Sequence, residues 1–345
     1  MNGSQDLSFI ALISNAHLIV QLIMALLLGL SIVSWTYIFK KWFDVRAARR
    51  LTIDFEKTFW AGGNLHQLYQ AAGSNRANNG ALSRIFEAGR VNAARDFAQN
   101  ELLTGVIDRD THQKCPEELI RKMGALGFMG MMVDPKYNGG GMDTISYVVA
   151  MEELSTIDAS ASVSMSVNNS LVCWGLEKYG TEEQKQKYLS RLATGEVLGA
   201  FCLSEPEAGS DATSQRTTAE KKGDHYLING TKNWITNGSS ASTYLVMAQT
   251  DVAKGHKGIN CLIVERGMAG FEVGAKENKL GIRGSDTHSL MFTDVKVPKE
   301  NRIGEDGFGF TFAMKTLGGG RIGIASQALG IASGAYELAL KYSKV

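Results

Sequence analysis

The sequence predicts an α+β chain in which a membrane-crossing helix precedes a helical domain, a small β-barrel or sandwich domain, and the first helix of a second helical domain. Three observations support this. Residues 18–39 carry no charge, residues 91–197 place apolar side chains at helical spacing, and residues 198–312 hold short β-branched and aromatic runs between Gly, Asn and Asp. Helical spacing returns over 313–345. We therefore expect four regions: 1–90, 91–197, 198–312 and 313–345.

Composition excludes several classes of protein. The 345 residues hold 36 Lys and Arg against 35 Asp and Glu, whereas a nucleic-acid binder shows a basic excess or stripe. Hydrophobic residues make up 44% and charged residues 21%, so the chain as a whole is not disordered. The 4 cysteines form no CxxC pair and the 6 histidines stand alone, so we expect neither a disulfide scaffold nor a metal centre.

The uncharged run Leu18–Phe39 is long enough to cross a bilayer. Its 22 residues span about 33 Å as a helix, and a bilayer core is about 30 Å thick. Basic residues dominate positions 40–50, which places the C-terminal side in the cytoplasm by the positive-inside rule. A cleaved signal peptide is the alternative, but the run is too long and no A-x-A site follows.

The following regions show conventional helix and strand signals. Thr181 and Gln184 form a capping box at the start of one helix. The helices are expected over 116–127, 142–157, 161–179 and 182–192, and near Phe312 a last helix begins that continues to Val345. Strands are expected around Tyr226, Thr243, Cys261 and Ser289. The last helix would find no partner within this chain for its apolar face.

The first of three chemically suggestive strings is Phe201–Asp211, which reads FCLSEPEAGSD. It predicts a strand that enters a tight turn, where Gly209 permits close backbone approach and Ser210 exposes a hydroxyl. Successive amides in such a turn suit an anionic ligand, for example a pyrophosphate or a reduced flavin. When this string is taken alone, an ordinary polar turn is the favoured explanation.

The second string, Lys232–Gly238, contains Trp234 and Thr236 two positions apart on a strand. Side chains at that spacing point the same way, so an aromatic plane would lie beside a hydroxyl, as a flavin ring requires. A core Trp with a hydrogen-bonded Thr is the alternative.

The third string contains three glycines, 318–320, which are expected just before a helix. Arg321 would then lie in the first turns of that helix, where a cation does not interact favourably with the helix dipole. A ligand contact is favoured there.

Together these strings resemble the acyl-CoA dehydrogenase family, whose signature is similar to 201–211 and whose flavin-side WIT stretch is similar to 234–236. Leu280–Thr287 and Val295–Pro298 are also similar to the β domain of that family. The resemblance covers about residues 92–345 and is strongest to the short-chain, butyryl-type members.

The resemblance implies an FAD enzyme that oxidises a short-chain acyl-CoA to the trans-2-enoyl-CoA, passes electrons to electron-transfer flavoprotein and assembles as a homotetramer. A base would remove the α-proton while a hydride leaves the β-carbon. The residues implied to line FAD are Phe201, Cys202, Leu203, Ser204, Gly209, Ser210, Trp234, Ile235 and Thr236. Those implied to meet the acyl-CoA are Ser210, Gly318 and Arg321.

The catalytic base departs from the family pattern. The expected Glu lies beyond Val345 in most members, and in others it precedes the arginine of the third string, where this chain has Gly320. Nothing in the resemblance assigns that role to Glu205, Glu207 or Asp211. We therefore expect this chain, with its C-terminal helical domain mostly missing, to be inactive by itself.

Residues 1–90 resemble the start of TolQ, an inner-membrane protein of the TolQ/ExbB/MotA group. The similar stretches include Leu22–Met24, Phe55–Glu56, Leu68–Gln70 and Ile85–Phe86. Only one of that family's three spans is present. The alternatives are therefore a TolQ-like proton-channel fragment, or a non-functional chimera joined near Gly89–Val91. We expect a bacterial inner-membrane protein with a cytoplasmic dehydrogenase region, or a cytoplasmic protein if the leading segment is an artefact.

Overall fold

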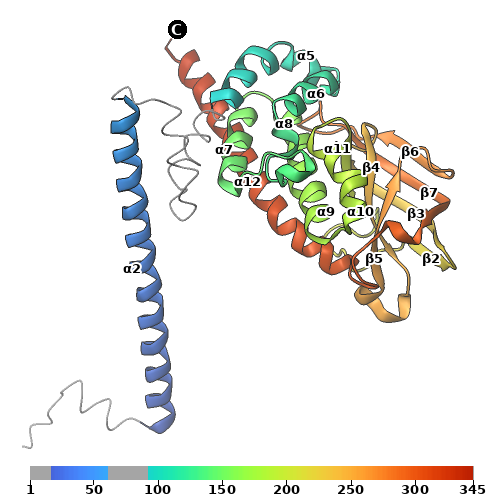
Figure 1. Cartoon of the computed structure of the whole chain (residues 1–345), viewed down its shortest axis with the longest axis horizontal. Coiled ribbons are helices and arrows are strands. Elements are labelled where there is room, and N and C mark those ends of the chain that lie inside the picture. Colours follow the sequence, from blue (N-terminus) through green and yellow to red (C-terminus); the bar gives the residue numbers. More distant parts are fainter. Residues whose placement is uncertain (1–16, 61–91, 345) are drawn as a thin grey trace, which may run out of the picture. The chain divides into compact units, whose positions relative to one another are not determined.

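The computed structural model describes residues 17–60 and 92–344, and the chain divides into two units, Met1–Ile85 and Phe86–Val345. In the first unit the described part is one helix, α2 (Leu18–Trp60), of 43 residues (Figure 1). Its segment Leu18–Lys40 has a mean hydropathy of 2.3 and is exposed, so its length and composition allow it to cross a membrane. The predicted join near Gly89–Val91 lies outside the described residues.

Helices form the first part of the second unit. Residues 92–97 are helical, and the following segments are η2 (Ala98–Leu102), α5 (Val106–Thr111), α6 (Glu117–Ala125), η3 (Phe128–Gly130), η4 (Pro135–Tyr137), α7 (Thr144–Ser155), α8 (Ala159–Ser166), η5 (Val167–Cys173), α9 (Trp174–Tyr179), α10 (Glu182–Gln184), η6 (Lys185–Leu189) and α11 (Ser190–Ala193). The predicted capping box is confirmed, because Thr181 and Gln184 exchange hydrogen bonds of 3.1 and 3.2 Å.

The predicted helix over 161–179 is interrupted by the π-helical segment η5. Asn168 lies in this wider turn and is fully buried. Its Nδ2 donates to the carbonyl oxygens of Met129 and Leu192 at 2.8 and 3.0 Å, and its Oδ1 accepts from Gly199 N at 3.0 Å. One side chain therefore joins three separate segments to the helix, which the 3.6-residue period does not indicate.

The β region is one eight-stranded sheet built from β1 (Leu198–Cys202), β2 (Thr218–Lys222), β3 (His225–Thr236), β4 (Ala241–Gln249), β5 (Ile259–Glu265), β6 (Phe271–Lys276), β7 (Thr287–Pro298) and β8 (Arg302–Ile303). Its order is β6-β7-β3-β2-β4-β5-β8, and β1 pairs with β4 in parallel. Within the second unit, the sheet lies to one side of the helices (Figure 1). The four predicted strand runs fall in β3, β4, β5 and β7, so the α+β class is confirmed. The apolar core lies between these helices and the sheet.

A single long helix, α12 (Gly309–Tyr342), follows the sheet and packs on α7, α8 and η5 (Figure 1). The expectation that this helix would find no partner within the chain is therefore wrong. The three glycines 318–320 therefore lie inside this helix, and the expectation that they precede it is wrong. Glycines further along have a packing role. A Cβ on Gly323 would lie 2.8 Å from Ser166 Oγ, and one on Gly330 would lie 2.7 Å from Ser155 Cβ, whereas Gly318 faces open space.

Candidate functional site

The site begins at the end of strand β1, where the chain enters a tight turn. Backbone hydrogen bonds of 3.1 and 3.2 Å between Glu205 and Ala208 close this turn. Glu205 and Ala208 are buried, whereas Gly209 and Ser210 are exposed, and a Cβ on Gly209 would meet nothing within 4 Å. The ends of the turn are therefore buried, and the two residues that follow it are exposed with open space beside Gly209, as predicted from the first string.

Strand β3 is distorted beside this turn. Trp234 has a φ of +58° and its side chain is 53% exposed. Pairing of β3 with β7 shifts register between Lys232 and Ile235, so Trp234 lies in a β-bulge. A positive φ at a bulky aromatic residue is a genuine outlier, and such strain is concentrated at ligand sites. The expected regular alternation does not hold through Trp234, although both Trp234 and Thr236 are more exposed than Ile235 between them.

The first two strings are joined by direct contacts. Asn233 N donates to Ser204 O at 2.9 Å. The Lys232 ammonium donates to Leu203 O at 3.0 Å and forms an ion pair with Glu205 at 2.7 Å, with both side chains buried. Burial lowers the pKa of Lys232, and the adjacent Glu205 only partly opposes this effect. Burial also acts to raise the pKa of Glu205, but the charge of Lys232 and its own hydrogen bonds lower it overall.

Several predicted FAD residues can meet a ligand through their main chain only. The side chains of Phe201, Cys202, Leu203 and Ile235 are all buried in the core. Burial also raises the pKa of the Cys202 thiol well above its ordinary value, so this thiol is inert. The exposed predicted residues are Gly209, Ser210 and Trp234, while Ser204 and Thr236 are partly exposed.

Helix α12, which carries the third string, reaches this region through an aromatic contact of an earlier residue. The rings of Phe201 and Phe312 are stacked with centroids 6.5 Å apart. Arg321 follows Phe312 by nine residues, or roughly 13 Å along α12, and is exposed, as is Gly318. Arg321 therefore lies in the middle of a helix and not in its first turns, which corrects the dipole argument.

The three carboxylates of the first string are already engaged. Glu205 pairs with Lys232, and Glu207 forms an ion pair with Arg216. Asp211 accepts hydrogen bonds of 2.5 Å from the hydroxyls of Ser214 and Thr213, which lower its pKa. The lowered pKa values of Glu205 and Asp211 make these two carboxylates weak proton acceptors.

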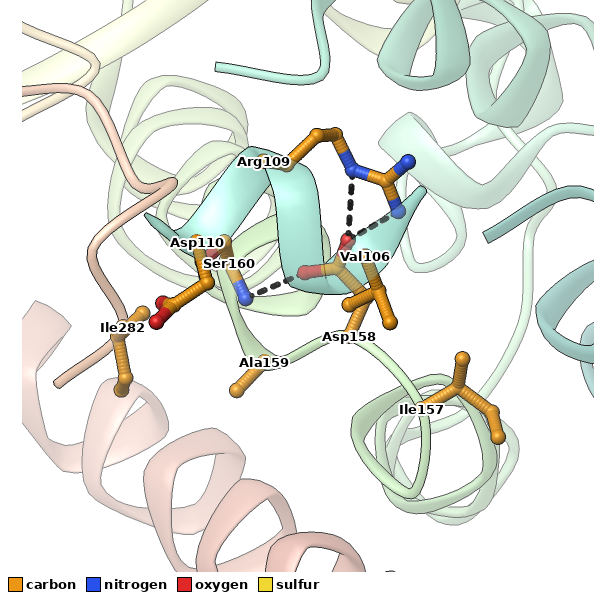
Figure 2. Close-up of a pocket in the computed structure, with 8 residues that line it drawn as sticks. All are labelled: Val106, Arg109, Asp110, Ile157, Asp158, Ala159, Ser160 and Ile282. Atoms are coloured by element: carbon orange, nitrogen blue, oxygen red, sulfur yellow. Dashed lines mark hydrogen bonds and ion pairs between the residues drawn. The ribbon is translucent and has the colours of Figure 1, made fainter. Parts of the chain in front are cut away.

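A separate cavity of about 210 Å³ lies between α5 and the start of α8 (Figure 2). Arg109 on its wall bonds Asp158 through Nε and Nη2 at 3.3 and 2.8 Å, and Asp158 also caps α8 by accepting from Ser160 N at 2.9 Å. Asp110 accepts from Arg283 N at 2.9 Å. These charged groups thus join separate segments of the fold, and none of the residues that line the cavity belongs to the three strings.

Known proteins match the second unit closely. Residues 90–196 match the model of the acyl-CoA dehydrogenase N-terminal domain, and residues 200–295 match that of the acyl-CoA dehydrogenase middle domain. A short-chain specific acyl-CoA dehydrogenase of Clostridium acetobutylicum is 50% identical over 250 residues, which are 72% of this chain and 66% of that protein.

Solved structures give the same result. The butyryl-CoA dehydrogenase of Megasphaera elsdenii has a TM-score of 0.73 at 46% identity, over 75% of this chain and 68% of that one. A chain in a structure described as an electron transferring flavoprotein of Acidaminococcus fermentans has a TM-score of 0.74 at 48% identity over the same shares. An acyl-CoA dehydrogenase of Bacillus anthracis complexed with FAD has a TM-score of 0.66 at 34% identity, over 71% of this chain and 41% of that one.

The chain belongs to the acyl-CoA dehydrogenase family. It spans just under two thirds of the length of its Clostridium acetobutylicum relative. Both family models lie within residues 90–295.

The sequence pattern did not single out two residues that organise the region where the first two strings meet. The first is Lys232, a charged residue inside a strand, and this unusual position was the available signal. The second is Asp286, whose Oδ2 accepts from Ser239 N and Ser240 N at 3.0 and 2.6 Å and so holds the loop that follows the WIT stretch. Its Oδ1 pairs with His288 Nε2 at 2.8 Å. Asp286 lies 46 or more positions from this loop, so no local spacing indicates the contact.

Proposed function

We propose that the chain is an FAD-dependent dehydrogenase that converts a short-chain acyl-CoA to the trans-2-enoyl-CoA. The observation that carries this proposal is Trp234, which is exposed and has a strained backbone next to the turn closed by Glu205 and Ala208. An exposed aromatic face beside such a loop suits a flavin. Membership of the family and the short-chain relative support the substrate class.

The described residues fit FAD. Gly209 is exposed, and a Cβ on it would meet open space, so a ligand can approach its main chain. Asn233 Oδ1 is a buried acceptor for which the described part of the chain supplies no donor. In our proposal the segment Phe201–Ser210 offers main-chain groups and the Ser210 hydroxyl, while Trp234–Thr236 flanks the ring system. When bound, FAD supplies the acceptor for the hydride of the β-carbon.

We propose that Ser210, Gly318 and Arg321 meet the acyl-CoA. The Arg321 guanidinium is exposed and permanently charged, which suits an anionic CoA substrate, and the open surface at Gly318 leaves room for it. We assign no described residue as the base. The described residues therefore account for binding and orientation, and proton removal requires a group that we do not assign.

We infer that electron-transfer flavoprotein is the electron acceptor, which the similarity to a chain from an electron transferring flavoprotein structure supports.

A homotetramer is proposed from the family resemblance alone, and light scattering of the purified protein tests it.

We also propose that α2 anchors the protein in a bacterial inner membrane, with the second unit in the cytoplasm. Side chains described within Leu18–Lys40 are exposed, and the basic residues after it would stay on the cytoplasmic side. Detergent should release the protein from membranes where high salt does not. Release by salt alone would refute the anchor. No observation on the described residues favours a TolQ-like channel function, and the predicted chimera stays a prediction.

Purified full-length protein in detergent tests the enzymatic proposal. It should bind FAD, and butyryl-CoA should bleach the bound flavin under anaerobic conditions if a base is available. Failure to bind FAD would refute the flavoprotein proposal. Binding without bleaching would refute dehydrogenation by this chain alone. Rapid oxidation of the reduced flavin by oxygen would instead indicate an oxidase.

A further inference from the structure

The side chain of Lys232 is fully buried beneath the site, and its Nζ faces three acceptors. These are Leu203 O at 3.0 Å, Glu205 Oε1 at 2.7 Å and Gln215 Oε1 at 3.0 Å. Gln215 Nε2 donates to Ala212 O at 2.8 Å, which fixes the amide with its oxygen toward Lys232. A neutral amine has only two hydrogens to donate, so three acceptors require the charged ammonium.

The carboxylate of Glu205, the partner of Lys232, also has hydrogen bonds to both of its oxygens. Glu205 Oε2 accepts from Arg216 N at 2.6 Å, and Oε1 accepts from Thr217 N at 3.1 Å as well as from Lys232. The backbone of Glu205 closes the turn with Ala208. One buried ion pair thus connects strand β3 to the end of β1, to the turn and to the returning segment at 215–217.

The groups above this ion pair are those that would meet a ligand. Gly209 and Ser210 are exposed in the loop that contains Glu205, and Trp234 follows Lys232 by two positions on β3. Asn233, which lies between Lys232 and Trp234 in the strand, donates its main-chain N–H to Ser204 O at 2.9 Å. Movement of the loop relative to Trp234 would separate a buried cation from its carboxylate, which a low-dielectric surrounding strongly opposes.

We propose that Lys232 is a positioning residue that holds the loop 203–215 and Trp234 in the relative arrangement that binds the flavin. This inference rests on the proposed FAD function. Lys232 does not touch the ligand in this proposal, because its side chain has no exposed surface. It acts through the main chain of the loop and through the bulge that presents Trp234.

The test compares full-length wild-type protein with Lys232→Met, with the double variant Lys232→Met/Glu205→Leu, and with Lys187→Met as a matched control. Lys187 also pairs with a glutamate, Glu265, at 2.7 Å, but its side chain is 58% exposed. The double variant leaves no unpaired charge in the core, so it should fold even where the single variant does not.

Hydrogen exchange of peptides covering 203–217 is measured on FAD-free protein, with peptides from α12 reporting on the global fold. We expect exchange in the loop to rise about tenfold or more in both Lys232 variants while α12 is unchanged. FAD affinity should fall about tenfold or more, and the visible circular dichroism of bound FAD should change. The Lys187 control should match wild type in all three readouts.

A folded double variant with wild-type loop exchange and wild-type FAD affinity would overturn the positioning role. So would a loss of stability without any change in the loop or in the dichroism of bound FAD, because that result describes a merely structural ion pair. If the wild type itself does not bind FAD, the proposed function fails, and unchanged loop exchange in the FAD-free variants would independently refute the positioning claim.

Discussion

Two glycines on α12 provide a direct test of why this helix is so rich in glycine. Gly330→Ala and Gly318→Ala place the same methyl group on the same helix. A Cβ at Gly330 would lie 2.7 Å from Ser155 Cβ and closer still to the Glu152 carbonyl oxygen of α7, whereas a Cβ at Gly318 would meet nothing within 4 Å.

The magnitudes follow from two opposing effects. Alanine is favoured over glycine inside a helix by about 1 kcal/mol, and this gain applies at both positions. Overpacking typically costs about 1–3 kcal/mol, and the upper end applies at Gly330 because the obstacle is the backbone of a buried helix. We expect Gly318→Ala to raise the free energy of unfolding by about 1 kcal/mol and Gly330→Ala to lower it by about 2 kcal/mol. Helix propensity cancels in the difference, which therefore reports the close packing of α12 on α7.

Urea unfolding of the full-length protein, followed by far-ultraviolet circular dichroism at constant temperature and detergent concentration, measures both variants. The reasoning is refuted if the two unfolding free energies agree within about 0.5 kcal/mol, because the packing contribution would then be absent.

Three further predictions concern single residues. Asn168→Ala should lower the free energy of unfolding by about 2 kcal/mol or more, because the Met129 carbonyl and the Gly199 N–H lose their bonds to this side chain, while the Leu192 carbonyl keeps its bond from Gly195 N; a loss below about 1 kcal/mol in urea unfolding would contradict this. Trp234→Gly should weaken FAD binding in a fluorescence titration while stability stays constant or rises by about 1 kcal/mol, since glycine adopts a φ of +58° without strain. A stability loss of about 3 kcal/mol would instead identify a core tryptophan. The lowered pKa of Glu205 contributes stability above its ordinary value of 4.5, and this contribution is lost as pH falls through the lower folded value. Glu205→Gln should therefore make the decline of unfolding free energy below about pH 4.5 shallower, and an unchanged slope would show that Glu205 titrates alike in the folded and unfolded chain.

Local signals in the chain predicted several helices and strands of the second unit. Capping at Thr181 depends on bonds within three positions, and each predicted strand run carries its own β-branched and aromatic residues, so both are readable without a tertiary structure. The exposed turn at Gly209 follows in the same way from its turn-forming composition. The residue types of the three strings also led directly to the acyl-CoA dehydrogenase family.

Other features depend on contacts between segments that are distant in the chain. The packing role of Gly323 and Gly330 depends on the approach of α7 and α8, which cannot be seen from the sequence of one helix alone. The π-helical turn at Asn168 exists where a side chain meets three other segments, which a 3.6-residue period cannot encode.

The sequence by itself determined the family, the order of helices and strands, the apolar helix at residues 18–39 and the loop that would meet a flavin. Only the tertiary structure decided which of those residues are exposed, that Trp234 is held in a strained bulge, and that Lys232 and Glu205 form a buried ion pair beneath them. The physical reason is one of range. Hydrogen bonding within turns and helices acts over three or four positions, whereas burial and ion pairing depend on how distant segments pack, as Lys232 and Glu205, 27 positions apart, illustrate.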